Sequence, residues 1–169
     1  IVLDICRRLD GLAYALVLAA AHVPVLGLGG LRDRLDDRLS WERRAGHDAQ
    51  ARHLSLQATL DWSHDLLTAD AQRVLHRLGV FSGSFSLDAV LQVVPDETLS
   101  AAAVLKALQT LVDHSLLEVE ASALLGSGDT PARYTLHEAV RLDARQRLVA
   151  SGLAMRLHDA HAAYFRFFS

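Results

Sequence analysis

Apolar residues recur at three- and four-residue spacing along most of the chain, a pattern typical of helices that bury one face. Near the amino terminus this spacing predicts the tail of a helix ending at Leu9, a helix over residues 12–22 and a short helix over residues 31–39. Pro24 is expected to end the second of these, and residues 27–30 are expected to form a turn.

The middle of the chain predicts further helices, separated by residues that can cap them or break them. They are expected over residues 54–66, 69–78, 87–93 and 101–113. Thr68, Ser86 and Ser100 each precede one of these helices and are suitable N-caps. Residues 40–53 show little periodicity, so this stretch is the best candidate for a linker.

The period changes from helical to alternating near residue 115, which predicts a strand over residues 115–120. A Gly/Ser/Asp-rich loop over 124–131 and a strand over 133–136 complete a β-hairpin, and helices over 138–149 and 153–168 follow. Successive helices, then a hairpin, then a helix, over residues 54–150, are the order of a winged-helix domain.

The sequence therefore predicts a mainly α fold with three parts. A small helical unit is expected over residues 1–48, a winged-helix domain with helices and one β-hairpin over 50–151, and the first helix of a helical arm over 153–169. The last helix has an apolar stripe that would need a neighbour, formed by Leu157, His161, Tyr164 and Phe168.

Composition limits the classes of partner and compartment. The formal net charge is −3, and Lys106 is the only lysine, so no general attraction to nucleic acid or anionic lipid is expected. Cys6 is the only cysteine, which excludes an intrachain disulfide and favours a reducing, cytoplasmic location. Residues 11–31 carry no Asp, Glu, Lys or Arg, but His22, Pro24 and the many alanines favour a buried helix over a membrane span.

Motifs for catalysis or metal binding are absent from the sequence. No Gly-x-x-x-x-Gly-Lys-[Ser/Thr] loop is present, so this segment is not expected to hold a nucleoside triphosphate by itself. No Gly-x-Ser-x-Gly elbow is present, and Cys6 lies on an apolar helix face that does not suit a nucleophile. The pairs His158/His161 and His47/His53 lack further ligands at metal-binding spacing. We expect neither an enzyme nor a metal site.

DNA binding is the alternative that a winged helix raises, and the charges argue against it. The helix over residues 101–113 would enter the major groove, and Lys106 is its only basic residue. The strand over 115–120 adds two glutamates, which would repel phosphate. A third alternative is a protein-interaction module that uses the apolar stripe ending in Phe165, Phe167 and Phe168, unless that stripe is a core face that lacks its partner.

His137 stands where the second strand of the hairpin becomes a helix. A side chain at such a junction lies beside backbone N–H groups that have no partner within the helix, a favourable place for an anionic ligand. The simpler alternative is a half-buried histidine that closes the hairpin. The local pattern alone favours this simpler alternative, since short motifs often match by chance.

Five segments, taken in order, resemble a known family. They are Arg-Leu-Asp-Gly-Leu-Ala-Tyr-Ala-Leu at residue 8, residues 58–67 and 78–85, Leu-Val-Asp-His-Ser-Leu-Leu at residue 111, and Arg-Tyr-Thr-Leu-His-Glu-Ala-Val-Arg at residue 133. Together they resemble the helical unit and winged-helix domain of STAND-class, NB-ARC-like ATPases. They are most similar to those of bacterial LuxR-like and antibiotic-regulator multidomain transcriptional regulators.

This resemblance implies a regulatory, non-catalytic segment that senses ADP or ATP and couples the nucleotide state to domain rearrangement. Its partners would be an upstream P-loop domain and downstream TPR-like repeats of the same chain, with self-association possible on activation. ADP or ATP would bind in the full-length protein and none in this segment alone.

The resemblance also implies roles for individual residues. By position, His137 would reach the β-phosphate of ADP, while Gly11, Leu12 and Ala13 would line the adenine side. Two residues depart from the family pattern: Ala13 stands where proline is usual, and Glu138 stands where aspartate is usual. A charged neighbour such as Glu138 would favour the protonated form of His137.

Overall fold

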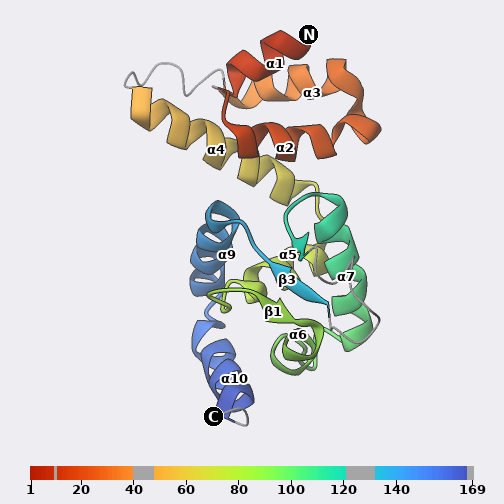
Figure 1. Cartoon of the computed structure of the whole chain (residues 1–169), viewed down its shortest axis with the longest axis vertical. Helices are drawn as coiled ribbons and strands as arrows, with labels where there is room; N and C mark the ends of the chain where they lie inside the picture. The colour runs from red at the N-terminus through yellow and green to blue at the C-terminus, as the bar shows by residue number, and fades with distance from the viewer. Residues whose placement is uncertain (10, 40–47, 121–131, 167–169) are drawn as a thin grey trace. The chain divides into compact units, whose positions relative to one another are not determined.

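The computed structural model describes residues 1–9, 11–39, 48–120 and 132–166, and Figure 1 labels most of its helices and strands. As the sequence predicted, the fold is mainly helical with one small antiparallel sheet. The chain divides into two compact units, residues 1–66 and 67–169. The three-part division expected from the sequence, with limits at 48/50 and 151/153, stays a prediction.

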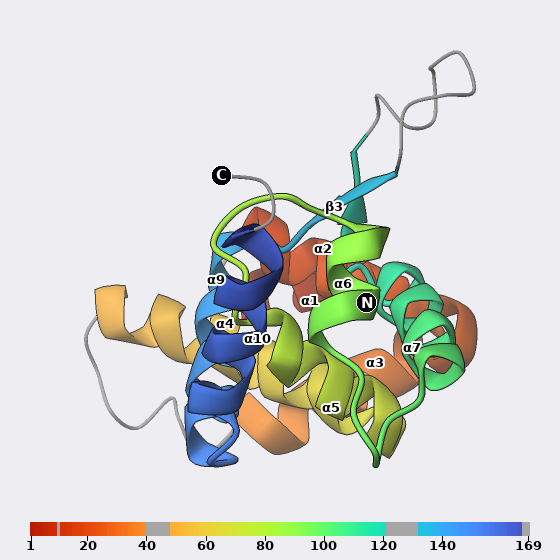
Figure 2. The same ribbon diagram turned by 90° about the horizontal axis from the view of Figure 1, so that it is seen from below.

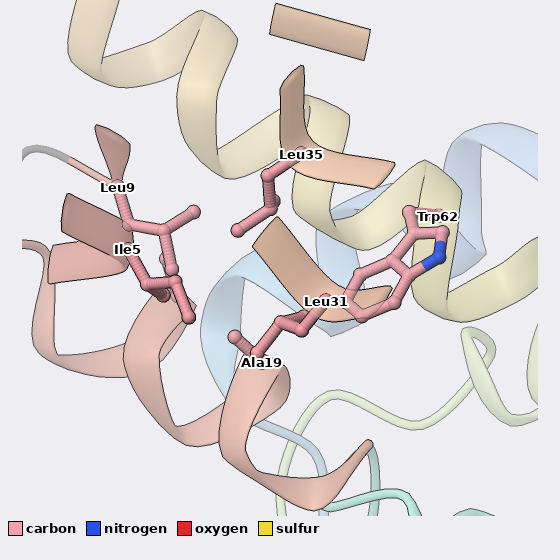
Figure 3. Close-up of a cluster of buried hydrophobic side chains, with 7 residues drawn as sticks. Ile5, Leu9, Ala19, Leu31, Leu35 and Trp62 are labelled. Carbon is pink, nitrogen blue, oxygen red and sulfur yellow. The ribbon is translucent and has the colours of Figure 1, made fainter. Parts of the chain in front are cut away.

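The described residues of the first unit form four helices: α1 (Val2–Arg8), α2 (Ala13–Ala21), α3 (Val23–Leu39) and α4 (Asp48–Asp65). α2 packs against α4, and α1 packs against α3. One apolar cluster holds them together (Figure 3), made of Ile5, Leu9, Ala15, Ala19, Leu31, Leu35 and Trp62. Trp62 comes from α4, so this helix contributes to the core of the first unit.

The segment after α2 corrects the sequence prediction. α3 already begins at Val23, so Pro24 stands in the first turn of a helix instead of ending one. A proline in the first turn removes no intrahelical hydrogen bond, which makes this position favourable. The expected turn over 27–30 is a kink within the helix, where Gly27 has φ 66°. α4 begins at Asp48, within the expected linker, while residues 40–47 lie outside the described part.

The uncharged stretch lies in α2 and the start of α3. Ala15, Leu18 and Ala19 of α2 are buried. Among the described residues, no single helix has the length and apolarity to cross a membrane; Ala13–Ala21 and Val23–Leu35 meet these criteria only as a pair bent by 118°.

The second unit contains α5 (Ala69–Leu78), α6 (Leu87–Val93), α7 (Ala101–Asp113), α9 (Glu138–Ala150) and α10 (Ala154–Arg166). The expected N-caps are confirmed: Thr68, Ser86 and Ser100 each accept a hydrogen bond from the backbone N–H three residues later. α5 packs against both α7 and α9. At Gly79 an added Cβ would lie 2.7 Å from the backbone nitrogen of Arg145, so the end of α5 packs directly against the backbone of α9 there.

The sheet has three short strands, β1 (Phe85–Ser86), β2 (Glu118–Val119) and β3 (Arg133–Thr135), in the order β1-β3-β2. β2 and β3 are the predicted hairpin, with a shorter first strand than the sequence suggested. β1 pairs antiparallel with the other edge of β3, placing Phe85 opposite Tyr134. The sequence missed β1 because two residues cannot show an alternating pattern. The expected loop over 124–131 lies outside the described residues.

α10 packs against α6 (Figures 1 and 2), so its apolar stripe has a neighbour within the second unit. Leu157 is fully buried, and the Tyr164 hydroxyl donates to an Asp88 carboxylate oxygen at 2.8 Å. The His161 ring lies 5.3 Å from that of Phe81 and 4.5 Å from that of Phe165. Phe167 and Phe168 lie outside the described residues.

An ion-pair node joins α5, the segment after α6 and α10. Arg77 is 3% exposed and donates to the Val94 carbonyl and to Asp96, each at 2.7 Å. Arg156 of α10 donates to the same Asp96 oxygen at 3.0 Å. Burial raises the pKa of Asp96, but hydrogen bonds from Thr98 and Arg77 outweigh it and hold this pKa well below its usual range.

Candidate functional site

The strand-to-helix junction predicted around His137 is present. β3 ends at Thr135, Leu136 is buried, and His137 is the exposed N-cap residue of α9. Its backbone is extended, with φ −57° and ψ 143°, and its Nδ1 accepts a hydrogen bond from the Ala139 N–H at 3.3 Å. His137 therefore satisfies one of the N–H groups that the start of a helix leaves without a partner.

This cap assigns the tautomer of the His137 ring. Because Nδ1 accepts, the neutral ring carries its proton on Nε2. A proton on Nδ1 would break the hydrogen bond from the Ala139 N–H, so a ring protonated on both nitrogens cannot cap α9. The neutral ring can donate through Nε2–H, and a phosphate contact therefore does not require the imidazolium form.

Glu138 makes its ion pair with Arg141 of the same helix. The Arg141 guanidinium donates to both carboxylate oxygens, at 2.9 and 2.6 Å. The Arg141 hydrogen bonds are the main reason that the pKa of Glu138 lies below its ordinary value. The sequence left two roles open for Glu138, to favour the protonated form of His137 or to pair with Arg141, and the structure shows the pair with Arg141.

The other expected nucleotide-binding residues lie in the first unit. Gly11 forms the turn between α1 and α2 with φ 65°, and its N–H donates to the Cys6 carbonyl at 3.0 Å. Leu12 is half-buried against the apolar cluster, and Ala13 is the exposed first residue of α2. His137 belongs to the second unit. The assignment of these four residues to a nucleotide site stays a prediction.

α7 is the helix that would face DNA in a winged-helix domain. Val104, Leu108 and Leu111 point into the core, which leaves Leu105, Lys106 and Gln109 exposed. The Gln109 amide donates to the Asp113 carboxylate at 2.8 Å. This face therefore presents one cation and one amide group that already has a partner.

Arginine charges in the second unit are largely neutralised. On the hairpin, Arg133 donates to the Ser84 carbonyl at 2.8 Å and lies 3.8 Å from Glu120. Further ion pairs among the described residues are Arg73–Asp70, Arg77–Asp96, Arg141–Glu138, Arg147–Asp143 and Arg156–Asp96. In the described part of the chain, no group of three His, Cys, Asp or Glu side chains could hold a metal ion.

Sequence reasoning missed two features of this unit. The Arg77–Asp96 pair joins residues far apart in the chain, and no periodic pattern signals it. The exposed apolar positions of α9, Leu142 and Val149, were not singled out, although their seven-residue spacing places them on one helix face. That spacing could have revealed the exposed apolar face from the sequence.

Comparison with known proteins identifies the domain. Residues 67–149 match the sequence profile of a winged helix-turn-helix domain. A protein of Mycobacterium tuberculosis, provisionally named an HTH-type transcriptional regulator, is 38% identical over 162 residues, which are 96% of this chain and 18% of that protein. An uncharacterized protein of the same species is 36% identical over 164 residues, 96% of this chain and 39% of its own length.

A more distant relative is the regulatory protein AfsR of Streptomyces griseus, 32% identical over 108 residues, which cover 64% of this chain and 10% of AfsR. No solved structure matches the chain. This chain spans 18% of the length of the HTH-type relative, which is about a fifth. The second unit thus carries a winged helix-turn-helix domain, in a chain homologous to proteins named as transcriptional regulators.

Proposed function

We propose that this chain is a regulatory, non-enzymatic segment of a transcriptional regulator and that its winged helix contacts DNA. The observation that carries the proposal is the match of residues 67–149 to a winged helix-turn-helix domain, together with the names of the relatives. The sequence favoured a nucleotide sensor with DNA binding as the alternative. The comparisons support the alternative better, because the name of the 38% identical relative is that of an HTH-type regulator.

The few exposed cations on α7 and the hairpin limit how strongly this domain can bind DNA. α7 offers Lys106, and the hairpin offers Arg133, whose side chain is 44% exposed and would have to leave Ser84 and Glu120 to reach a phosphate. Two phosphate contacts give a logarithmic salt dependence of about −2, far below that of a strongly basic DNA-binding protein. The contact would therefore be weak and would need a neighbouring segment or a second subunit for high affinity.

Fluorescence anisotropy with a mixed-sequence duplex tests this directly. Binding is expected at low salt and should fall with a slope of about −2 on a log–log plot. Lys106→Ala and Arg133→Ala should each weaken binding, whereas Arg166→Ala on α10 serves as a matched cation control. Absence of any binding at low salt, or equal binding by Lys106→Ala, would exclude a DNA-contacting role for α7.

Nucleotide sensing is the second candidate, and the exposed His137 at the start of α9 favours it. The resemblance to STAND ATPases implies that an upstream P-loop domain supplies the nucleotide and that His137 contacts its β-phosphate. A single hydrogen bond to a charged phosphate is worth about 1.5–3 kcal/mol, and it can bias domain closure by no more than that.

The full-length protein is the right material for this second test. His137→Asn keeps an N-cap residue on α9 but removes the imidazole, whereas His137→Ala removes both. A sensor role predicts reduced ADP retention and altered transcriptional output for both variants, with His158→Ala as the control. If His137→Asn retains ADP like the unmodified protein, His137 has a purely structural role.

A further inference from the structure

The outer side of α9 carries a row of side chains that are exposed in the described part of the chain. Leu142 is 47% exposed and Val149 is 62% exposed. They stand one heptad apart, with two polar residues between them at the positions that share their face. Together these four residues line a shallow hollow of about 430 Å³; they are Leu142, Arg145, Gln146 and Val149.

Arg145 differs from the other arginines of α9. Arg141 is paired with Glu138, and Arg147 is paired with Asp143. Arg145 is exposed, and its guanidinium has no ion-pair or hydrogen-bond partner in the part of the chain that the structure describes. A positive charge without a partner therefore stands between two exposed apolar side chains.

We propose that this face of α9 docks an acidic amphipathic helix of a partner protein. Apolar residues of that helix, one heptad apart, would cover Leu142 and Val149, and a carboxylate between them would pair with Arg145. Spacing and charge together select this partner, since a helix laid along a helix presents side chains at the same three- and four-residue intervals.

Two other occupants fit less well. DNA would satisfy Arg145 through phosphate but offers its backbone no apolar group to cover Leu142 and Val149. A second copy of this chain, docked by the same face about a two-fold axis, would bring two Arg145 charges together near the centre of the contact. An acidic helix satisfies both the apolar and the charged positions.

The test uses two fluorescent helical peptides that are identical except at one position. Both carry leucines a heptad apart, and the residue between them is glutamate in one and lysine in the other. The chain should bind the glutamate peptide saturably and the lysine peptide about tenfold more weakly. Arg145→Glu should invert this preference, and Leu142→Ala should weaken both complexes. Arg166→Glu, a charge reversal on exposed α10, should change neither.

Each contrary result overturns the proposal. No saturable binding of the glutamate peptide excludes the acidic helix, and so does an unchanged preference in Arg145→Glu. A duplex DNA that displaces the peptide and loses affinity in Arg145→Glu would assign the face to nucleic acid. Self-association that Leu142→Ala abolishes would assign it to a second copy. Circular dichroism confirms that the variants fold, and none of these results depends on DNA binding by α7.

Discussion

Gly79 is the position where a single methyl group should disturb the second unit most directly. Its backbone, with φ −60° and ψ −11°, suits any residue, so alanine introduces no torsional strain. A Cβ there would lie 2.7 Å from the Arg145 nitrogen, 2.8 Å from the Ala144 carbonyl carbon and 2.9 Å from the Arg145 Cα. These are backbone atoms of α9, which cannot turn away as a flexible side chain can.

The magnitude follows from two opposing effects. Ordinary carbon contacts lie at about 3.5–4.0 Å, so α9 would have to retreat on the order of 1 Å. Overpacking of this kind costs about 1–3 kcal/mol. Replacing glycine lowers the entropy of the unfolded chain, which returns about 0.4–1 kcal/mol. Gly79→Ala should therefore lose about 1–2 kcal/mol of stability, with a fall in Tm of about 5 °C.

Urea and thermal unfolding followed by far-ultraviolet circular dichroism measure this loss. Gly83→Ala is the matched control, because Gly83 is exposed and a Cβ there would meet nothing within 4 Å. Its stability should change by less than about 0.5 kcal/mol. If Gly79→Ala unfolds at the same urea concentration as Gly83→Ala, or at a higher one, the close packing of α5 on α9 is refuted.

Three further predictions concern the second unit. Asp96→Asn leaves the buried Arg77 charge without its partner and should cost about 3 kcal/mol at pH 7; Asp88→Asn, at an exposed position, should cost far less in the same urea titration. Because the pKa of Asp96 lies below its ordinary 3.8, its stabilisation is complete above pH 3.8 and disappears as the pH falls through the folded-state pKa. The difference from Asp96→Asn should therefore shrink in acid, and a constant difference would contradict the ion pair. Ser100→Ala removes the N-cap of α7 and should cost about 1 kcal/mol, while Ser82→Ala on the exposed loop should be neutral; equal Tm values for the two would contradict the capping role. Burial and the nearby His158 lower the pKa of His161 below 6.5, so the folded state favours the neutral ring and loses stability as the pH falls below 6.5. His161→Phe should show a smaller fall in Tm between neutral and mildly acidic pH, and an unchanged fall would exclude this group.

Local features of the fold were predictable because they depend on neighbours in sequence. Ser86 and Ser100 predicted the starts of α6 and α7 because capping needs one side chain and the N–H three residues later. Pro24 misled because the same residue suits the end of one helix and the first turn of the next. The Arg77–Asp96 pair was invisible because only the tertiary fold brings these residues together.

The candidate site shows the same division. The strand, His137 and the helix could be placed from the sequence, since the change of period locates the junction. The capping role of Nδ1 and the pairing of Glu138 with Arg141 needed coordinates, because the sequence allowed Glu138 to act on His137 or to pair with Arg141. A nucleotide partner is implied only by the family resemblance and follows neither from the residue pattern nor from the coordinates.

The central position of β3 has a mechanical consequence. Tyr134 of β3 lies opposite Phe85 of β1 on one side and Val119 of β2 on the other, so the hairpin cannot swing away as a unit without breaking its ladder with β1. Buried Leu136 is the only residue between this strand and His137, where α9 begins. α9 has 13 residues, a lever arm of about 20 Å, and a tilt of about 10° at its first turn would carry its far end through about 3 Å. Because Ala144 and Arg145 pack closely on Gly79, such a tilt would also have to break this contact in the middle of α9.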